Sequence, residues 1–448
     1  MAIKSFSLIV KKPIKDFKKK IKADSDKSLS IRSFLIGAIS QDISKIRNVL
    51  ESEDVFSTIE CLKKLGVKII KRGKGEYHIY GKGLGSLFAN KNAALNCGNS
   101  GTLARLLIGI LSTTPNINVK IYGDKSLNNR SMEKLFKLME NFGAEFLPHN
   151  KTKFPINLSS SSLPIGIDYV AGSSAQLKSA VILAGLNSFG CTNILEKQKS
   201  RNHTENILAK SSNVIKFKKK NNTNFIKIYG KKYLDAIKFS VPSDPSNAAF
   251  YVALTLLKKK SSIRINNLNL NESRIGFYSL MKKHGAKIKF INLKKNNIEK
   301  IGDLIVKSCK IKPIRASKEY YVSSTDEYPI MFVIAALTKG ISVFKGISDL
   351  ANKESNRINE MKKILKQIGV KCVTKKDEMK IYGLKEIKNQ KKIIKVPNLG
   401  DHRICMSAVI LSLVTGIKAE IKNFETVATS SPSFLNIIKK LGGKFEIR

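Results

Sequence analysis

The chain has 448 residues, 42% hydrophobic and 7% aromatic, which is typical of a globular protein with two large domains or several small ones. No apolar run approaches the roughly 18 residues of a membrane helix, and the N-terminal stretch has no signal-peptide pattern. We therefore expect a cytoplasmic protein with no membrane partner. The six cysteines are scattered with no C-x-x-C pair and no disulfide-like clustering, which predicts reduced thiols.

The formal net charge of +47 at pH 7 permits nucleic-acid binding. However, the lysines occur in short runs at 18–20, 218–220 and 258–260, without interleaved aromatic residues. Lys, Ile and Asn share A/T-rich codons, so we attribute most of the charge to codon composition and expect no nucleic-acid partner. Of the 81 basic residues, 12 are arginines. Because Arg grips carboxylates and phosphates with a planar fork, each arginine marks a candidate anion contact.

A helix end, a glycine or asparagine and a short alternating strand recur along the chain. The positions of this small residue, which favours the C-cap of a helix, are Gly66, Gly143, Asn213, Gly285, Gly369 and Gly442. The steps of roughly 75 residues are too long for a solenoid repeat and predict six mixed units. We expect an α/β protein of two domains with three units each, joined near 239–250. A second repeat, "IYG", ends predicted strands at Gly81, Gly123, Gly230 and Gly383.

Short polar segments open apolar helical patterns between these caps. In chain order they are "DKSLSIR" at 26–32, "GNSGTLAR" at 98–105, "GDKSLNNR" at 123–130, "GSSAQLKSA" at 172–180, "SRNHTE" at 200–205, "STDEYP" at 324–329, "NKESNR" at 352–357 and "GDHR" at 400–403. Half of the arginines lie in these segments, namely Arg32, Arg105, Arg130, Arg201, Arg357 and Arg403. Glycines before a helix also leave its N–H groups open to an anion, as in the loop 98–102. The set predicts a site for one or two multiply anionic substrates.

These segments, in this order, resemble the 5-enolpyruvylshikimate-3-phosphate synthase (3-phosphoshikimate 1-carboxyvinyltransferase) family over about residues 22–440. The resemblance implies two similar domains, each of three βαβαββ units, forming an inside-out α/β barrel with the active site in the interdomain cleft. It also implies that residues 1–25 join 245–448 in one discontinuous domain, while 26–244 form the other.

The resemblance implies transfer of the enolpyruvyl group of phosphoenolpyruvate to the 5-hydroxyl of shikimate 3-phosphate, with release of phosphate and no metal or organic cofactor. The implied catalytic residues are Asp326 as base, Glu354 as proton-transfer partner, and Lys27. The implied contacts to shikimate 3-phosphate are Lys27, Ser28, Arg32, Ser174, Ala175, Gln176, Arg201, Asp326 and Lys353. The implied contacts to phosphoenolpyruvate are Lys27, Asn99, Gly101, Thr102, Arg105, Arg130, Gln176, Arg357 and Arg403. Asp326 also stands where a helix N-cap could lie.

Some residues depart from the family pattern. Ser25 replaces a glycine, Ile31 a common histidine and Asn356 an aspartate, while Ala351 and Thr429 stand where relatives can carry basic residues. These departures leave open a catalytically inactive relative. The sequence is also compatible with a UDP-N-acetylglucosamine enolpyruvyl transferase, although "GDKSLNNRSM" lacks the cysteine of that family, and with a basic nucleic-acid-binding protein. The favoured interpretation is a monomer that acts on two small molecules.

Overall fold

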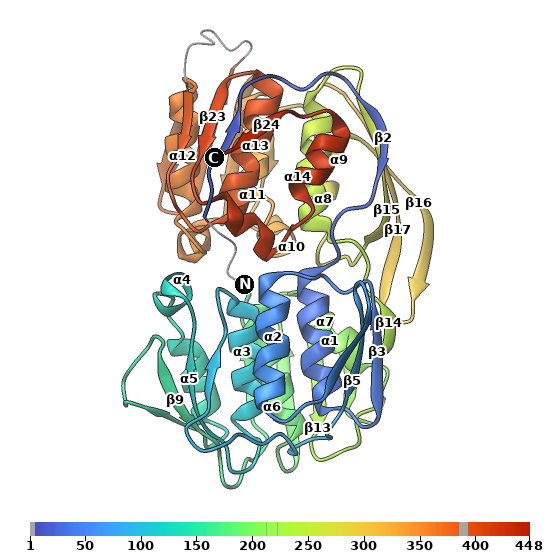
Figure 1. Cartoon of the computed structure of the whole chain (residues 1–448), viewed down its shortest axis with the longest axis vertical. Helices are drawn as coiled ribbons and strands as arrows, with labels where there is room; N and C mark the ends of the chain where they lie inside the picture. Colours follow the sequence, from blue (N-terminus) through green and yellow to red (C-terminus); the bar gives the residue numbers. More distant parts are fainter. Residues whose placement is uncertain (1–4, 212, 222, 385–392) are drawn as a thin grey trace. The chain divides into compact units, whose positions relative to one another are not determined.

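The structure is a computed structural model, and it describes residues 5–211, 213–221, 223–384 and 393–448. The chain divides into two compact units, drawn in Figure 1. Unit 1 comprises Met1–Asp24, Pro242–Lys295 and Glu299–Arg448, and unit 2 comprises Ser25–Val241 and Asn296–Ile298. The expected boundaries, after 25 and after 244, therefore differ from these by one and by three residues. The return of 296–298 to unit 2 has no counterpart in the periodic sequence pattern.

The elements of unit 2 alternate strands with helices. In chain order they are α1 (Lys27–Ile39), β3 (Ile43–Arg47), α2 (Glu53–Lys64), β4 (Ile69–Gly73), β5 (Glu76–Tyr80), β6 (Ala94–Asn96), α3 (Gly101–Leu111), β7 (Asn118–Tyr122), α4 (Lys125–Asn128), α5 (Glu133–Glu140), β8 (Glu145–Leu147), β9 (Ile156–Ser159), β10 (Asp168–Ala171), α6 (Ala175–Leu186), β11 (Cys191–Glu196), α7 (His203–Leu208), β12 (Ile215–Lys220), β13 (Thr223–Tyr229) and β14 (Lys238–Ser240).

Unit 1 repeats the same alternation. Its elements are β1 (Leu8–Val10), β2 (Lys18–Ile21), α8 (Pro245–Leu257), β15 (Ser262–Asn269), α9 (Gly276–Lys283), β16 (Lys287–Asn296, whose last residue belongs to unit 2), β17 (Glu299–Lys307), β18 (Arg315–Ala316), α10 (Tyr320–Ser324), α11 (Tyr328–Ala336), β19 (Gly340–Lys345), the 3-10 helix η1 (Ser348–Asn352), α12 (Arg357–Gln367), β20 (Lys371–Lys375), β21 (Glu378–Gly383), β22 (Ile393–Val396), α13 (His402–Thr415), β23 (Lys418–Ile421), the 3-10 helix η2 (Phe424–Thr429), α14 (Phe434–Leu441) and β24 (Phe445–Ile447).

The described residues form six four-stranded sheets with one common strand order. In the sheet β6-β7-β9-β8, β6 and β7 are parallel, while β9 runs antiparallel to both β7 and β8. A parallel pair needs a crossover, which α3 supplies here, and a tight turn then suffices for the last antiparallel pair. The sheets β10-β11-β13-β12 and β18-β19-β21-β20 have the same order. This is the topology of one βαβαββ repeat, and its six occurrences confirm the predicted sixfold repeat.

Three of these sheets are completed by strands from distant parts of the chain. The strand β2 pairs in parallel with β15, as Figure 1 shows by the blue strand beside β15, and β1 lies between β23 and β24. In unit 2, β14 supplies the parallel edge strand next to β3. The N-terminal segment is therefore part of two sheets of unit 1.

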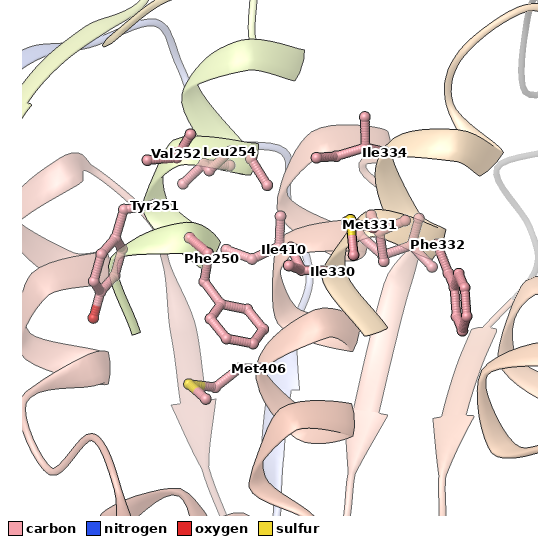
Figure 2. Packing of buried hydrophobic residues seen from close by; sticks show 14 of the residues in the cluster. Phe250, Tyr251, Val252, Leu254, Ile330, Met331, Phe332, Ile334, Met406 and Ile410 are labelled. Atoms are coloured by element: carbon pink, nitrogen blue, oxygen red, sulfur yellow. The ribbon is translucent and has the colours of Figure 1, made fainter. Parts of the chain in front are cut away.

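Each unit has three buried inner helices and a set of amphipathic outer ones. The inner helices are α1, α3 and α6 in unit 2 and α8, α11 and α13 in unit 1. Figure 2 shows Phe250 of α8, Ile330 of α11 and Met406 and Ile410 of α13 within the core of unit 1. The outer helix α14 buries residues 434, 437, 438 and 441, the spacing of one apolar helix face.

Close packing of the inner helices requires one particular glycine. A side-chain carbon at Gly109 of α3 would lie 2.6 Å from the carbonyl oxygen of Ala180 and 2.8 Å from its Cα atom. Real Cβ atoms do not approach backbone this closely, so glycine lets α3 and α6 pack with their backbones nearly touching.

The two repeated glycine signals have separate structural reasons. All five predicted cap glycines have φ between 80° and 100°, which confirms the left-handed caps, whereas Asn213 adjoins residue 212, outside the described residues. At Gly81, Gly230 and Gly383 a Cβ would lie within 2.1 Å of a carbonyl oxygen at the end of an inner helix. Each of these three "IYG" motifs ends the fourth strand of a βαβαββ repeat. The fourth motif, at Gly123, follows the second strand β7, so all four motifs end strands, as predicted.

Candidate functional site

The polar segments that precede α1, α3, α6, α11 and α13 in the sequence lie at the N-termini of these inner helices. The side chains of Asp26, Ser100, Ser174, Asp244 and Asp401 occupy N-cap positions and accept hydrogen bonds from backbone N–H groups one turn onward. These caps satisfy some of the free N–H groups, and the helix dipole leaves a positive partial charge at each start. The sequence therefore places its basic side chains where the backbone also favours anions.

The loop 98–102 lies against two arginines. Arg130 Nη2 donates to Asn99 Oδ1 at 2.6 Å, and Asn99 Nδ2 donates to Asp124 Oδ2 at 2.7 Å. A Cβ on Gly101 would lie 2.6 Å from Arg105 Nη1 and 3.2 Å from Arg130 Nη1. Glycine at the start of α3 therefore leaves room for both guanidinium groups beside the helix N-terminus.

A glutamine joins the starts of α3 and α6. Gln176 Nε2 donates to Thr102 Oγ1 at 3.0 Å, while Gln176 Oε1 accepts from Arg105 Nη1 at 2.9 Å. The same Arg105 nitrogen donates to the Gly101 carbonyl at 3.1 Å. These bonds bring together six of the residues implied for phosphoenolpyruvate, namely Asn99, Gly101, Thr102, Arg105, Arg130 and Gln176.

The side chain of Arg32 is almost completely buried between helices. Its Nε donates to Thr204 Oγ1 at 2.9 Å, its Nη2 to Ser179 Oγ at 3.3 Å and its Nη1 to the Ser28 carbonyl at 3.1 Å. Arg32 thus connects α1 with α6 and α7. These three hydrogen bonds hold the guanidinium group of Arg32 in one orientation.

The remaining implied residues of unit 2 lie at the same helix starts. Lys27 is the first residue of α1, and its ammonium forms an ion pair with buried Asp54 at 2.9 Å. Ser174 and Ala175 begin α6, and half-buried Arg201 lies directly before α7.

In unit 1, Arg357 is surrounded by three carboxylates. Its Nε donates to Asp401 Oδ2 at 2.9 Å, its Nη2 to Glu354 Oε2 at 2.6 Å, and its Nη1 lies 3.8 Å from Asp326 Oδ1. Burial disfavours the charge of this 1% exposed side chain, but the carboxylates of Asp401, Glu354 and Asp326 outweigh it and raise the pKa of Arg357. Arg357 is therefore a permanent cation between two of the implied catalytic acids.

Two other basic residues of unit 1 are also held in place. Arg403 Nη1 donates to Asn247 Oδ1 of α8 at 3.1 Å, and its guanidinium lies 5.8 Å from the ring centroid of Phe250. Lys353 pairs with Asp349 at 2.6 Å, and the Tyr321 hydroxyl donates to the same carboxylate at 2.8 Å.

The structure contradicts an N-cap role for Asp326. The N-cap position of α11 is Glu327, and Asp326 lies in the turn between α10 and α11 with its side chain 25% exposed. By contrast, Asn356 is the N-cap of α12 and accepts from Asn359 N at 3.1 Å. Because Asn and Asp cap helices equally well, this departure from the family pattern keeps its local structure.

The sequence reasoning missed most of the partners that orient these residues. They are Asp54, Asp124, Ser179, Thr204, Asn247 and Asp349. Ser179, Thr204 and Asp124 lie inside the polar segments, so their membership of these segments was the usable signal. Asp54 and Asp349 lie outside those segments. Among the described residues, no three His, Cys, Asp or Glu side chains are grouped as metal ligands, and no helix is long and apolar enough to cross a membrane.

The fold is that of the enolpyruvyl transferases. It matches the solved enolpyruvyl transferase NikO from Streptomyces tendae with a TM-score of 0.76 over 99% of both chains, at 12% sequence identity. A family model described as EPSP synthase (3-phosphoshikimate 1-carboxyvinyltransferase) matches residues 11–438. The chain belongs to this EPSP synthase family.

Individual relatives agree with this assignment over nearly their whole length. A 3-phosphoshikimate 1-carboxyvinyltransferase from Zymomonas mobilis is 35% identical over 96% of this chain and 95% of its own, and that of Bacillus subtilis is 34% identical over 94% and 96%. A solved EPSP synthase from Acinetobacter baumannii is 32% identical, with a TM-score of 0.85 over 99% of this chain and 100% of its own.

Proposed function

We propose that this chain transfers the enolpyruvyl group of phosphoenolpyruvate to the 5-hydroxyl of shikimate 3-phosphate and releases phosphate. It is then an enzyme of the shikimate pathway, which leads to chorismate and the aromatic amino acids. The observation that carries the proposal is the joining of the family's segments into two hydrogen-bonded networks, one around Gln176 and one around Arg357. We also expect the enzyme to act as a cytoplasmic monomer on these small molecules.

We assign the anionic groups of the substrates to the arginines and helix starts. Shikimate 3-phosphate would be held by Lys27, Ser28, Arg32, Ser174, Ala175, Gln176, Arg201, Asp326 and Lys353. Phosphoenolpyruvate would be held by Lys27, Asn99, Gly101, Thr102, Arg105, Arg130, Gln176, Arg357 and Arg403. The fixed guanidinium groups would bind carboxylate and phosphate without first having to be ordered, so binding energy remains for the reaction.

The reaction requires two proton movements. The 5-hydroxyl must lose a proton as its oxygen bonds to C2 of phosphoenolpyruvate, while the methylene carbon C3 gains one. Loss of that C3 proton with departure of phosphate then restores the double bond in the product. We assign Asp326 as the base toward the hydroxyl and Glu354 and Lys27 as proton-transfer partners. The Arg357 cation, in contact with both acids, would stabilise negative charge that develops during the addition.

Phosphate release by the purified protein tests this function. Release should require both substrates together and should fall by about 100-fold or more in Asp326→Ala, the range of a lost general base. A matched control is Asp303→Ala, which removes another Arg-paired aspartate of unit 1, 2.6 Å from Arg264, and should leave the rate unchanged. Release with UDP-N-acetylglucosamine but not with shikimate 3-phosphate would contradict the proposed acceptor.

A further inference from the structure

A buried group of charges in unit 2 has no role in the function proposed above. The Lys178 ammonium, on the second turn of α6, lies 2.6 Å from Glu196 Oε1 and 2.5 Å from Glu205 Oε1. The side chain of Lys178 is fully buried and both glutamates are 3% exposed. Removing three charges from water is costly, and apolar side chains of similar volume often give equal stability. The triad therefore calls for a reason beyond stability.

The triad closes the ends of one loop. Glu196 is the last residue of β11, Glu205 lies in the first turn of α7, and the chain between them forms the loop 197–202. Lys178 thus binds the element before this loop and the element after it through a single nitrogen. Arg201, one of the residues assigned to shikimate 3-phosphate, lies within the loop.

Glu196 also holds the loop directly beside Arg201. The backbone N–H and the hydroxyl of Ser200 both donate to Glu196 Oε1 at 2.9 Å, and Asn224 Nδ2 donates to Glu196 Oε2 at 2.9 Å. Burial raises the pKa of Glu196, but the Lys178 charge and these hydrogen bonds outweigh it and lower the pKa overall. Glu196 is therefore an ionised acceptor that fixes the backbone N–H and the side chain of Ser200, the residue before Arg201.

The end of the loop connects to the second arginine assigned to the same substrate. Thr204, the residue before Glu205, accepts from Arg32 Nε at 2.9 Å and donates to Ser179 Oγ at 2.8 Å. Ser179 follows Lys178 on α6. The start of α7 is thus bound to α6 by the ion pair and by a hydroxyl chain that ends on Arg32.

We propose that Lys178, Glu196 and Glu205 are positioning residues for shikimate 3-phosphate, which hold the loop 197–202 so that Arg201 and Arg32 are ready to grip its anionic groups. The inference rests on the proposed function, in which these two arginines bind that substrate. It predicts that weakening the triad changes the use of one substrate and not of the other.

Steady-state kinetics of Glu196→Gln and Ser200→Ala test the proposal. A hydrogen bond to a charged group contributes enough that Glu196→Gln should raise the KM for shikimate 3-phosphate by about tenfold or more, and Ser200→Ala should raise it by about threefold. The KM for phosphoenolpyruvate and kcat should stay within about twofold. Equal loss for both substrates would overturn the proposal. Ser200→Ala, which keeps all three charges, remains informative if Glu196→Gln fails to fold.

Glu51→Gln is the matched control. Glu51 is a glutamate of unit 2 whose side chain is 22% exposed, and it accepts from Lys71, from a backbone N–H and from a hydroxyl, as Glu196 does. It lies outside the assigned residues, so both KM values should stay unchanged. A rise in the KM for shikimate 3-phosphate as large as in Glu196→Gln would show a general effect of lost ion pairs and would overturn the positioning role.

A double-mutant cycle with Arg201→Ala separates positioning from simple stability. If Glu196 acts through Arg201, Glu196→Gln should change the KM for shikimate 3-phosphate by less than about threefold once Arg201 is removed. If the effects of the two substitutions on the KM for shikimate 3-phosphate are fully additive, Glu196 does not act through Arg201 and the positioning role is overturned.

Amide exchange of residues 197–202 in the substrate-free protein supplies a measurement that needs no activity. Exchange should rise about tenfold in Glu196→Gln and stay unchanged in Glu51→Gln. Faster exchange in Glu196→Gln, together with a wild-type protein that releases no phosphate, would refute the proposed function but keep the loop restraint. Unchanged exchange in Glu196→Gln would overturn the positioning role even in an active enzyme.

Discussion

Replacing Arg357 by methionine should destabilise unit 1 by roughly 3–4 kcal/mol. The substitution leaves Asp401, which is 0% exposed, without its cation. Breaking a buried ion pair costs about 3–5 kcal/mol. The lower end applies because Asp401 still accepts from Ser355 Oγ at 2.9 Å and from two backbone N–H groups. Glu354 and Asp326 are 20% and 25% exposed, so losing those pairs adds at most about 1 kcal/mol.

Urea unfolding of the purified protein measures this effect. The chain has no tryptophan, so circular dichroism at 222 nm is the suitable signal, and amide exchange within α13 assigns the transition to unit 1. With a denaturant slope of about 3 kcal/mol per M, the midpoint should fall by about 1 M. The double variant Arg357→Met/Asp401→Asn should recover about half of the loss, because asparagine can still cap α13 without a buried charge.

Two results would refute this reasoning. One is a midpoint shift below about 0.3 M in Arg357→Met, which would mean that Asp401 tolerates burial without its cation. The other is a lack of recovery in the double variant. Arg264→Met is the control, since its partner Asp303 is 15% exposed and Arg264 itself 39%, so this loss should stay near 1 kcal/mol.

Gly109→Ala should destabilise unit 2 by about 2–3 kcal/mol, because its Cβ would meet the Ala180 backbone at 2.6 Å; thermal unfolding checks this, and a neutral result would contradict the close helix contact. Burial raises the pKa of Cys372 to about 11, so about one thiol in a thousand is ionised at pH 8. Its alkylation by iodoacetamide, followed by mass spectrometry, should accelerate about tenfold from pH 8 to pH 9, and a rise of only about threefold, as for an ordinary thiol pKa of about 8.5, would contradict the shift. Arg105→Lys should raise the KM for phosphoenolpyruvate about tenfold, because one ammonium cannot reproduce the Arg105 contacts to Gln176 and the helix start, whereas an unchanged KM would remove Arg105 from the site.

The sequence pattern located local features well. The cap glycines have a left-handed backbone that few residues adopt, and the helix starts at 27, 101 and 402 need side chains that cap the helix, so the sequence marks both directly. Pairing between distant strands leaves no such mark. Nothing in the N-terminal segment itself shows that β1 lies between β23 and β24, because any short alternating strand could fill that place.

The candidate site likewise combines residues that the sequence marks with residues that it does not. Arginines were conspicuous because lysine is the common basic residue of this chain, whereas Asp54 and Asp349 lie outside the polar segments and resemble ordinary polar residues until their partners are known. The triad of Lys178 was hidden for another reason. In a chain this rich in lysine, one buried lysine is indistinguishable by sequence from the many exposed ones.

The pairing of the N-terminal strand β1 with two C-terminal strands affects the order in which the protein can fold during synthesis. Apart from the turn 296–298, unit 2 is complete once residue 241 has been made, and it can form its sheets while the rest is translated. The strand β1 must wait for β23 and β24, roughly 400 residues later, or about 20–80 s at a synthesis rate of about 5–20 residues per second. During that interval its edges are unpaired and open to wrong partners. Nascent chains stalled before residue 418 should therefore contain a folded unit 2 beside an unfinished, chaperone-dependent unit 1.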